Sequence, residues 1–332
     1  MNPSHTTLQA LQQNRNAPVK WNTRRESTPF QVFLIGLIIS GLFLSLTAKA
    51  EITVMDDQHT ALTLPEPANR IVSLAPSITE LLFSAGAGDK VVAVVQYSDY
   101  PEAAKALPRV GGYTQLDVER ILALQPDLVI GWQSGNQPQA LEKLRQLGIP
   151  VYITETRFLE QIPETLERFG KLAGTDDTAT REATRFRNTL NQLKNQYQNK
   201  ASVSVFYQVW NQPLITINKQ NLINQVIEAC GGRNVFADLD TIAPRIDVEA
   251  VLQANPDAIV ASGMGVERPE WLDEWLKWPA ISAVKNDQLH FIPPGHIQRQ
   301  TVRVLLGAER LCQQLDQTRM LKMTSGQEGS VQ

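Results

Sequence analysis

Short apolar runs alternate with helical patterns along most of the chain. In the first half, β-rich runs occupy residues 70–74 (RIVSL), 91–95 (VVAVV), 127–132 (DLVIGW) and 150–154 (PVYIT). Stretches with helical spacing separate them, notably 118–124 and 139–147. The sequence Ser77-Ile78-Thr79-Glu80 has the form of a capping box and predicts a helix that opens there and runs to about residue 85. Strands that alternate with helices indicate βαβ units around a parallel sheet.

A strandless segment at 159–200 interrupts this alternation. Charged and amide residues surround its leucines and phenylalanines, and Pro163 and Gly174 divide it, so we expect a short helix followed by a long one. Strand-like runs then resume at 202–210, 214–217, 258–261 and 289–292. A last helix is expected at 301–315, after a helix that ends near Cys230.

The pattern therefore predicts an α/β protein with a lobe on each side of the helical segment. The boundaries we expect are 1–50 for a processing segment, 51–158 for the first lobe, 159–200 for the interlobe helical segment, 201–316 for the second lobe and 317–332 for a polar, disordered tail.

The two halves also share an internal repeat. Residues 116–130 read LDVERILALQPDLVI and residues 246–260 read IDVEAVLQANPDAIV, so Asp, Val, Glu, Leu, Pro and Asp recur in register. Each copy predicts a helix with Asp117 or Asp247 at its N-cap, then a turn and a buried strand. Two lobes built as copies would face each other across a cleft, where ligands of α/β folds commonly bind.

The N-terminus has the features of a signal peptide. Residues 32–46 form an uncharged apolar run of a length typical of a signal-peptide h-region, basic residues precede it, and Ala48-Lys49-Ala50 follows it. We expect cleavage after about residue 50 and export to the periplasm. The alternative is an N-terminal anchor helix.

Charge and cysteine usage fit an exported protein. The chain carries a formal charge of −3, and residues 1–50 hold five basic residues against Glu26, which leaves −7 after cleavage. Such a chain is not suited to nucleic acid or to an anionic membrane surface. Cys230 and Cys312 are expected to be bridged in an oxidising compartment, with two separately buried thiols as the alternative.

The sequence favours binding over catalysis. His59, His290 and His296 have no carboxylate or cysteine at a metal-ligand spacing, and phosphate-loop and nucleophile-elbow motifs are absent. We therefore expect no enzyme activity, no cofactor and no metal site; a Rossmann-like enzyme is the alternative from another class.

Aromatic and proline residues gather at the predicted strand ends. Loop-borne rings there suit a large, flat, partly apolar ligand, and ordinary core packing is the alternative. These candidates are Pro76, Tyr97, Tyr100, Tyr113, Trp132 and Trp210. Residues 296–299 (HIQR) follow a Pro-Pro-Gly turn beyond the last strand and could hydrogen-bond ligand amides or carboxylates.

Several motifs resemble those of a known family. RIVSLAPSITELLFSAG (70–86), YSDYP (97–101), LDVERILALQPDLVI (116–130) and LINQVIEACGG (222–232) are similar to the periplasmic cobalamin (vitamin B12)-binding proteins of ABC importers. These belong to the class III, helical-backbone substrate-binding proteins, which also serve ferric siderophores and haem. The resemblance covers residues 68–316. It implies two Rossmann-like α/β lobes joined by a single long interlobe α-helix, with a ligand cleft between the lobes.

The resemblance implies a function and a site. The protein would capture a corrinoid, cobalamin itself, as a transported ligand; the alternative within this fold is a receptor for ferric siderophore or haem. The family's cleft tyrosine falls on Tyr97, a cleft tryptophan on Tyr113, and a second-lobe tryptophan on Ala243, for which Trp210 is a candidate replacement. With the strand-end candidates, the expected ligand contacts are Pro76, Tyr97, Tyr113, Trp132, Trp210, Gly295, His296, Ile297, Gln298 and Arg299.

The resemblance also implies a partner. The family's permease-docking glutamates fall on Glu119 and Glu249, which occupy the same place in the two repeat copies. One carboxylate per lobe of a monomeric receptor would meet arginine pockets of a permease homodimer that carries ATPase subunits. The alternative is that these acids only stabilise their helix starts through the helix dipole. The family disulfide falls on Cys230 and Cys312.

Overall fold

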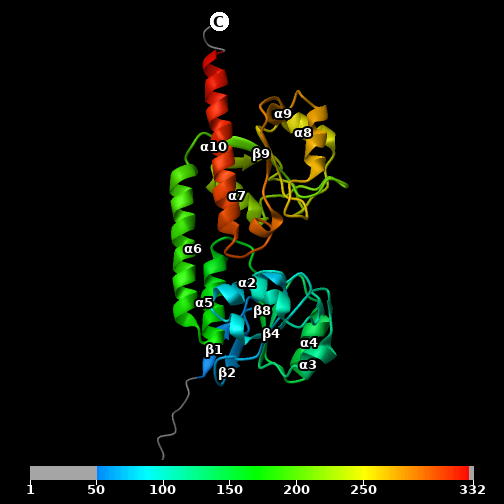
Figure 1. The fold of residues 1–332 in the computed structure, drawn as a ribbon, viewed down its shortest axis with the longest axis vertical. Coiled ribbons are helices and arrows are strands. Elements are labelled where there is room, and N and C mark those ends of the chain that lie inside the picture. The colour runs from blue at the N-terminus through cyan, green and yellow to red at the C-terminus, as the bar shows by residue number, and fades with distance from the viewer. Residues whose placement is uncertain (1–50, 329–332) are drawn as a thin grey trace, which may run out of the picture. The chain divides into compact units, whose positions relative to one another are not determined.

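The computed structural model describes residues 51–328, so the expected signal peptide at 1–50 lies outside the described residues. The first lobe is built on a parallel sheet of order β4-β3-β7-β8 (Figure 1). Its strands are β3 (Ile71–Ser73), β4 (Val91–Val94), β7 (Leu128–Trp132) and β8 (Val151–Thr154). Its helices are α2 (Pro76–Ser84), α3 (Val118–Ala123) and α4 (Pro138–Gln146), with 3-10 turns Gly88–Lys90 and Glu102–Ala106. Two antiparallel pairs complete it, β1 (Ile52–Met55) with β2 (Ala61–Leu64) and β5 (Gly111–Gly112) with β6 (Gln115–Leu116).

The second lobe repeats this arrangement in a parallel sheet of order β10-β9-β11-β12. Its strands are β9 (Val203–Gln208), β10 (Gly232–Asn234), β11 (Ala258–Ala261) and β12 (Leu289–Phe291). Its helices are α7 (Leu222–Ala229), α8 (Val248–Ala254) and α9 (Ser282–Lys285), with 3-10 turns Glu270–Lys277 and Pro294–His296. In both sheets the first strand lies between the second and the third, so the predicted α/β fold of two copied lobes is confirmed.

The repeated aspartates explain why the two lobes fold alike. Asp117 and Asp247 cap α3 and α8 by accepting from the backbone N–H three residues on. Asp127 then accepts from the N–H groups of Asn69 and Arg70, at 2.8 and 2.9 Å, and so ties the start of β7 to the start of β3. Asp257 makes the matching bond to the N–H of Ser204 in β9, at 2.9 Å. The same residues thus fix the same strand pairing in each lobe.

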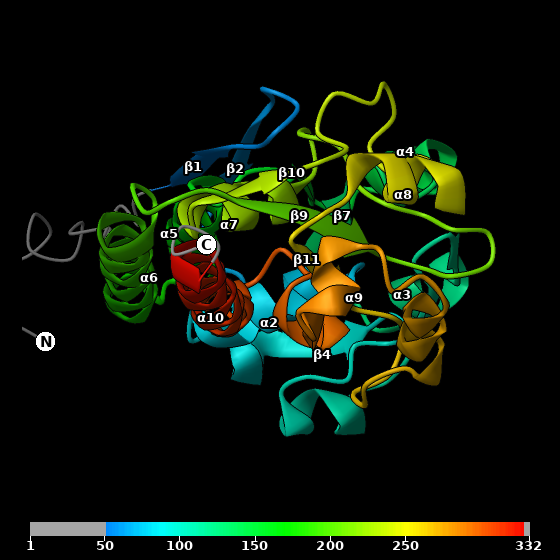
Figure 2. The same cartoon turned by 90° about the horizontal axis from the view of Figure 1, so that it is seen from above.

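One helical pair connects the sheets. The expected short and long helices are α5 (Gln161–Ala173) and α6 (Asp176–Tyr197), separated by Gly174, which adopts the left-handed conformation (φ 66°) that glycine tolerates. Together with α7 and α10 (Val304–Glu328) they cover one side of the sheets, whereas α3, α4, α8 and α9 lie on the other (Figures 1 and 2). A continuous buried core runs through both lobes along α5 and α6, from Ile71 through Phe186 to Val205.

The last helix differs from the expectation. Instead of ending near residue 315 before a disordered tail, α10 spans Val304–Glu328. The extension is held because Arg319, 4% exposed, donates to the carbonyls of Ala201 and Cys230, and the Thr318 hydroxyl donates to Gln288 at 2.7 Å. Residues 317–328 are therefore helical, and Thr318 and Arg319 pack on the second lobe.

Two local predictions were wrong. The segment 214–217 forms isolated bridges of Ile215 with Trp210 and Arg245 instead of a strand, and β10 was not foreseen. Helix α2 starts at Pro76, and its N-cap, Ala75, makes no side-chain cap bond. The Thr79 hydroxyl bonds to Ser73 and Ala75 instead, so Glu80 serves no capping box.

The predicted disulfide is confirmed. Cys230, at the end of α7, is bridged to Cys312 in α10, and both are fully buried. The bond joins the two helices that cover one side of the second sheet.

Within the described range 51–328, no helix is both long and apolar enough to cross a membrane.

Breaking this disulfide is expected to destabilise the protein. The bridge closes a loop with a sequence separation of 82, and its loss should lower the free energy of unfolding by roughly 4 kcal/mol on the loop-entropy model. Urea unfolding of the exported protein with and without reductant measures this change. Reductant should have no effect on a Cys230→Ala/Cys312→Ala control. Equal midpoints for oxidised and reduced wild type would contradict the prediction.

Candidate functional site

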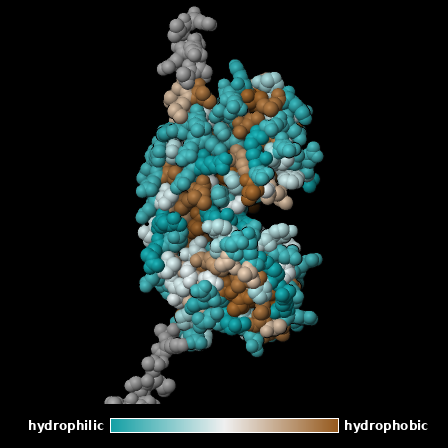
Figure 3. Space-filling model, in the orientation of Figure 1, coloured by the Kyte–Doolittle hydropathy of each residue, from teal (hydrophilic) through white to brown (hydrophobic). Residues whose placement is uncertain are grey.

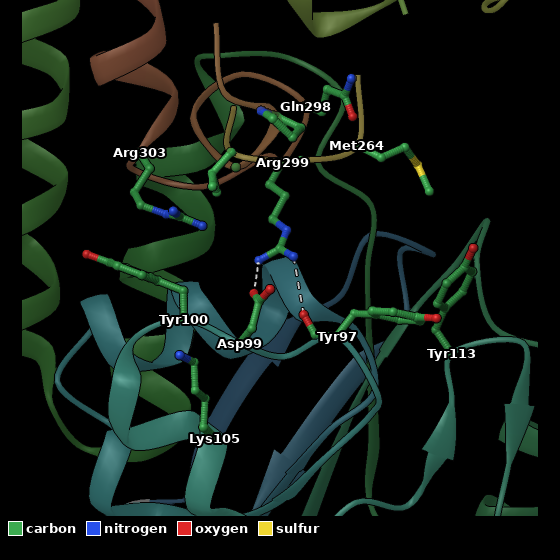
Figure 4. A pocket seen from close by; sticks show the side chains of 13 residues that line it. Tyr97, Asp99, Tyr100, Lys105, Tyr113, Met264, Gln298, Arg299 and Arg303 are labelled. Carbon is green, nitrogen blue, oxygen red and sulfur yellow. Dashed lines mark hydrogen bonds and ion pairs between the residues drawn. The ribbon is translucent and has the colours of Figure 1, made fainter. Parts of the chain in front are cut away.

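A cavity of about 650 Å³ lies between the lobes, at the carboxyl ends of both sheets (Figures 3 and 4). The first lobe contributes residues from the loop after β4 and from the β5–β6 turn; the second contributes residues from the loops after β11 and β12. The lining residues are Tyr97, Asp99, Tyr100, Lys105, Tyr113, Met264, Gly265, Val266, Pro294, Gly295, Gln298, Arg299 and Arg303.

Aromatic rings form the first lobe's side of the cavity. Tyr97 is 71% exposed and has a left-handed backbone (φ 64°), which is uncommon for a bulky residue and turns the chain sharply after β4. The ring of Tyr113 lies against Trp132, with ring centroids 5.7 Å apart. Trp132 therefore supports Tyr113 from behind.

One buried amide fixes these loops. Asn136, 4% exposed, donates to the carbonyls of Leu74 and Tyr113, at 2.9 and 2.7 Å, and accepts from the N–H of Trp132 at 2.7 Å. It thereby ties together the chain after β3, the Tyr113 turn and the end of β7. The rings of Tyr113 and Trp132 are therefore positioned by hydrogen bonds between the Asn136 side chain and the backbones of these two residues.

The second lobe presents an apolar wall. Met264 and Val266 are each 82% exposed and stand on the loop after β11, where Gly263 (φ 69°) turns the chain. Figure 4 shows Met264 across the cavity from Tyr113. Gln298, on the loop after β12, reaches the carbonyl of Gly263 at 3.4 Å, a weak bond that leaves its amide available to a ligand.

Charged side chains close the deep end of the cavity. Glu80 from α2, Asp99 from the loop after β4, and Arg299 and Arg303 from the second lobe form a cluster that we call the interlobe ion cluster. Burial opposes the charge of Asp99, but the hydrogen bond from Arg299 prevails and holds the pKa of Asp99 below its usual value. Asp99 is therefore ionised at neutral pH.

A family model described as periplasmic binding protein matches residues 71–295. The chain belongs to the periplasmic binding protein family.

Named relatives and solved structures match most of the chain. The vitamin B12-binding proteins of Vibrio cholerae and Yersinia pestis are 38% and 37% identical to it, over 76% of this chain and 90% and 89% of their own lengths. The crystal structure of the periplasmic vitamin B12-binding protein BtuF of Vibrio cholerae superposes with a TM-score of 0.70 at 37% identity, covering 76% of this chain and 98% of that one. A haem-binding protein from Roseiflexus, RhuT, shares the fold, with a TM-score of 0.68 at 24% identity.

The structure brings some of the expected ligand contacts together. Those that line the cavity are Tyr97, Tyr113, Gly295, Gln298 and Arg299. Trp132 stands behind Tyr113 and borders a neighbouring interlobe cavity of about 220 Å³.

Other expected contacts lie elsewhere. Ile297 is fully buried in the continuous core, so it does not line this cavity. Pro76 is the first residue of α2, outside the lining, and Trp210 donates from Nε1 to the carbonyl of Gln212. His296 is half-buried beside the lining; burial and the charges of Arg303 and Arg310 lower its pKa, so its imidazole is neutral at pH 7.

Several lining residues escaped sequence reasoning. Asp99 was part of the YSDYP motif but received no role. Met264 and Val266 stand on the loop that follows the predicted strand 258–261, which was the available signal, whereas Arg303 was expected inside the last helix at 301–315 and lies just before α10. Among residues 51–328, no group of three or more His, Cys, Asp or Glu side chains could hold a metal ion. Glu119 and Glu249 are exposed near the starts of α3 and α8, away from the cavity.

Removing the amide of Asn136 is expected to loosen the aromatic side of the cavity. In Asn136→Ala, buried backbone groups lose their partners, which costs about 1–3 kcal/mol for each group left unsatisfied. The free energy of unfolding should fall by at least about 2 kcal/mol on this basis. Chemical denaturation followed by tryptophan fluorescence measures this fall.

The matched control for this prediction is Asn195→Ala, an exposed position on α6. Equal stability of the two variants would contradict the role assigned to Asn136.

Proposed function

We propose that this protein captures cobalamin between its lobes and delivers it to an ABC importer. The observation that carries the proposal is the cavity: aromatic and apolar side chains from both lobes surround it at the carboxyl ends of two parallel sheets. The relatives named vitamin B12-binding proteins, at 37–38% identity, support the ligand class. Cobalamin would be a transported ligand and not a cofactor, and the protein would act as a receptor and not as an enzyme.

The side chains of the cavity suit a large apolar ring system. Tyr97 and Tyr113 would pack on one side of a corrin, and Met264 and Val266 on the other, so that burial of these exposed groups drives binding. Met is well suited to such a surface, because its flexible thioether adapts to an irregular ligand face. Gln298 would hydrogen-bond the amide groups at the corrin rim.

The charges of the cavity favour an amide-rimmed ligand over an acidic one. Each lining cation has an acidic partner, in the pairs Lys105–Glu102 at 2.8 Å, Arg299–Asp99 at 2.6 Å and Arg303–Glu80 at 2.6 Å. A ligand whose recognition depends on carboxylates, such as haem, would have to compete with these acids for the same cations. The amides of a corrin need only neutral hydrogen-bonding partners.

Export and docking complete the proposal. The signal-peptide features of residues 1–50 support a periplasmic receptor, released after cleavage and acting as a monomer. Glu119 and Glu249 would dock on equivalent arginine pockets of a homodimeric permease with its ATPase subunits. Their exposure and their equivalent places in the two lobes support this role.

Truncation of the aromatic rings is expected to weaken cobalamin binding. Tyr97→Ala removes a direct contact and Trp132→Ala removes the support of Tyr113, so Tyr97→Ala should have the larger effect. Losses of about 2 and 1 kcal/mol, or roughly 30-fold and fivefold in Kd, are typical of such ring contacts. Calorimetric titration with cyanocobalamin measures them, with haem and a ferric hydroxamate as competing ligands.

Phe158→Ala, which truncates a half-exposed ring outside the cavity, is the control and should bind as wild type does. Affinities within twofold of wild type for both variants would contradict the aromatic contact. Tight binding of haem or the ferric hydroxamate without cobalamin binding would show that the ligand is that chelate and not cobalamin.

Removal of the two repeat glutamates is expected to abolish uptake without changing ligand affinity. Loss of one partner of a desolvated charge pair costs about 2–5 kcal/mol, so Glu119→Ala/Glu249→Ala should lose permease binding. The measurements are permease pull-down and vesicle uptake, beside cyanocobalamin titration. The control variant, Glu142→Ala/Glu270→Ala, also removes one exposed acid from each lobe. Normal uptake by the folded double variant would mean that both glutamates only stabilise their helix starts through the helix dipole.

A further inference from the structure

A single buried carboxylate joins the two lobes at the deep end of the cavity. Glu80 lies on α2 of the first lobe and is 2% exposed. Its Oε1 accepts from Arg299 Nη1 at 2.8 Å and from Arg303 Nη2 at 2.6 Å, and its Oε2 accepts from Arg303 Nε at 2.9 Å. Both arginines belong to the second lobe, and the pair with Arg303 is bidentate, which fixes its geometry as well as its distance.

Besides Glu80, both arginines contact the first-lobe loop after β4, which lines the cavity. Arg299 donates from Nη1 to Asp99 at 2.6 Å and from Nη2 to the carbonyl of Tyr97 at 3.2 Å (Figure 4). The guanidinium of Arg303 lies 3.9 Å from the ring centroid of Tyr100, a cation–π contact. Residues 97, 99 and 100 of one loop are thus each held from the opposite lobe.

Ser98 anchors this loop within its own lobe through bonds from Thr79 and Arg109, but Tyr97 depends on contacts from the opposite lobe. Tyr97 has a positive φ of 64° and a side chain that is 71% exposed, so neither its backbone preference nor its own burial holds it in place. Removing the Glu80 charge would leave two guanidinium groups near the deep end of the cavity with Asp99 as their remaining acid in the interlobe ion cluster. The two like charges would then repel each other and move apart.

We propose that Glu80 is a positioning residue for ligand binding. It holds Arg299 and Arg303 across the cleft and, through them, fixes both the Tyr97 loop and the separation of the lobes. The identity of the ligand rests on the proposed function, but the separation of the lobes does not. The ligand-ready spacing is therefore built into the empty protein, with little closure left for the ligand to induce.

The test measures lobe separation and ligand affinity in the same variants. Spin labels on Glu142→Cys and Glu270→Cys, one exposed site per lobe, report the distance between the lobes by pulsed electron spin resonance, since the native cysteines are bridged. Without ligand, the spin-labelled protein with an intact interlobe ion cluster should give one narrow distribution of distances between the labels. Glu80→Gln, which keeps the shape but removes the charge, should broaden or shift it and weaken cyanocobalamin binding by about tenfold or more.

The matched control removes a bidentate ion pair that does not cross the cleft. Glu167 in α5 accepts from Arg187 in α6 at 2.6 and 2.8 Å, so Glu167→Gln should leave both the distance distribution and the affinity unchanged. Glu80→Asp, which keeps the charge on a shorter side chain, should restore part of the affinity lost in Glu80→Gln. If Glu80→Gln does not fold, Asp99→Asn serves in its place and should broaden the distribution to a smaller extent.

The outcomes separate the two proposals. A folded Glu80→Gln protein with an unchanged distance distribution and an affinity within twofold of wild type would overturn the positioning role. Failure of wild type to bind cyanocobalamin would reject the proposed ligand, and the distance measurement would still decide the role of Glu80.

Discussion

One continuous hydrophobic core constrains everything else in this molecule. It runs from the first sheet along α5 and α6 into the second sheet, and the disulfide between Cys230 and Cys312 lies within it. Because protein cores pack densely, two lobes that share one core cannot move apart as independent bodies. The carboxyl ends of both sheets therefore face each other across one cleft, where the interlobe ion cluster limits the movement that the shared core still permits, and the loops after the strands are the segments free to carry function.

The cleft combines two kinds of surface. Its mouth is aromatic and apolar, with Tyr97 and Tyr113 on one side and Met264 and Val266 on the other, whereas its deep end is closed by the interlobe ion cluster. The cluster contains two acids and two arginines, so its formal net charge is zero. Its ion pairs therefore hold the lobes together more than they attract a charged ligand. An apolar mouth with a charge-balanced deep end suits a receptor that binds a bulky ring system through apolar contacts and releases it unchanged.

Much of this could be predicted from the sequence where local rules decide the structure. The aspartates of the repeat, Asp117 and Asp247, fixed both helix starts, and Gly174 marked the break between α5 and α6. Contacts between segments distant in sequence could not be foreseen. Glu80 had the spacing of a capping box, yet its partners lie more than two hundred residues away, and Ile297 lies on the loop after β12 but is buried in the core.

A crystal structure of the protein with cyanocobalamin would show whether the corrin binds in the cleft between the lobes. We expect a corrin held between Tyr97 and Tyr113 of one lobe and Met264 and Val266 of the other, with the bonds of Glu80 to Arg299 and Arg303 intact. A corrin bound outside this cavity, or a cluster broken apart by the ligand, would contradict it.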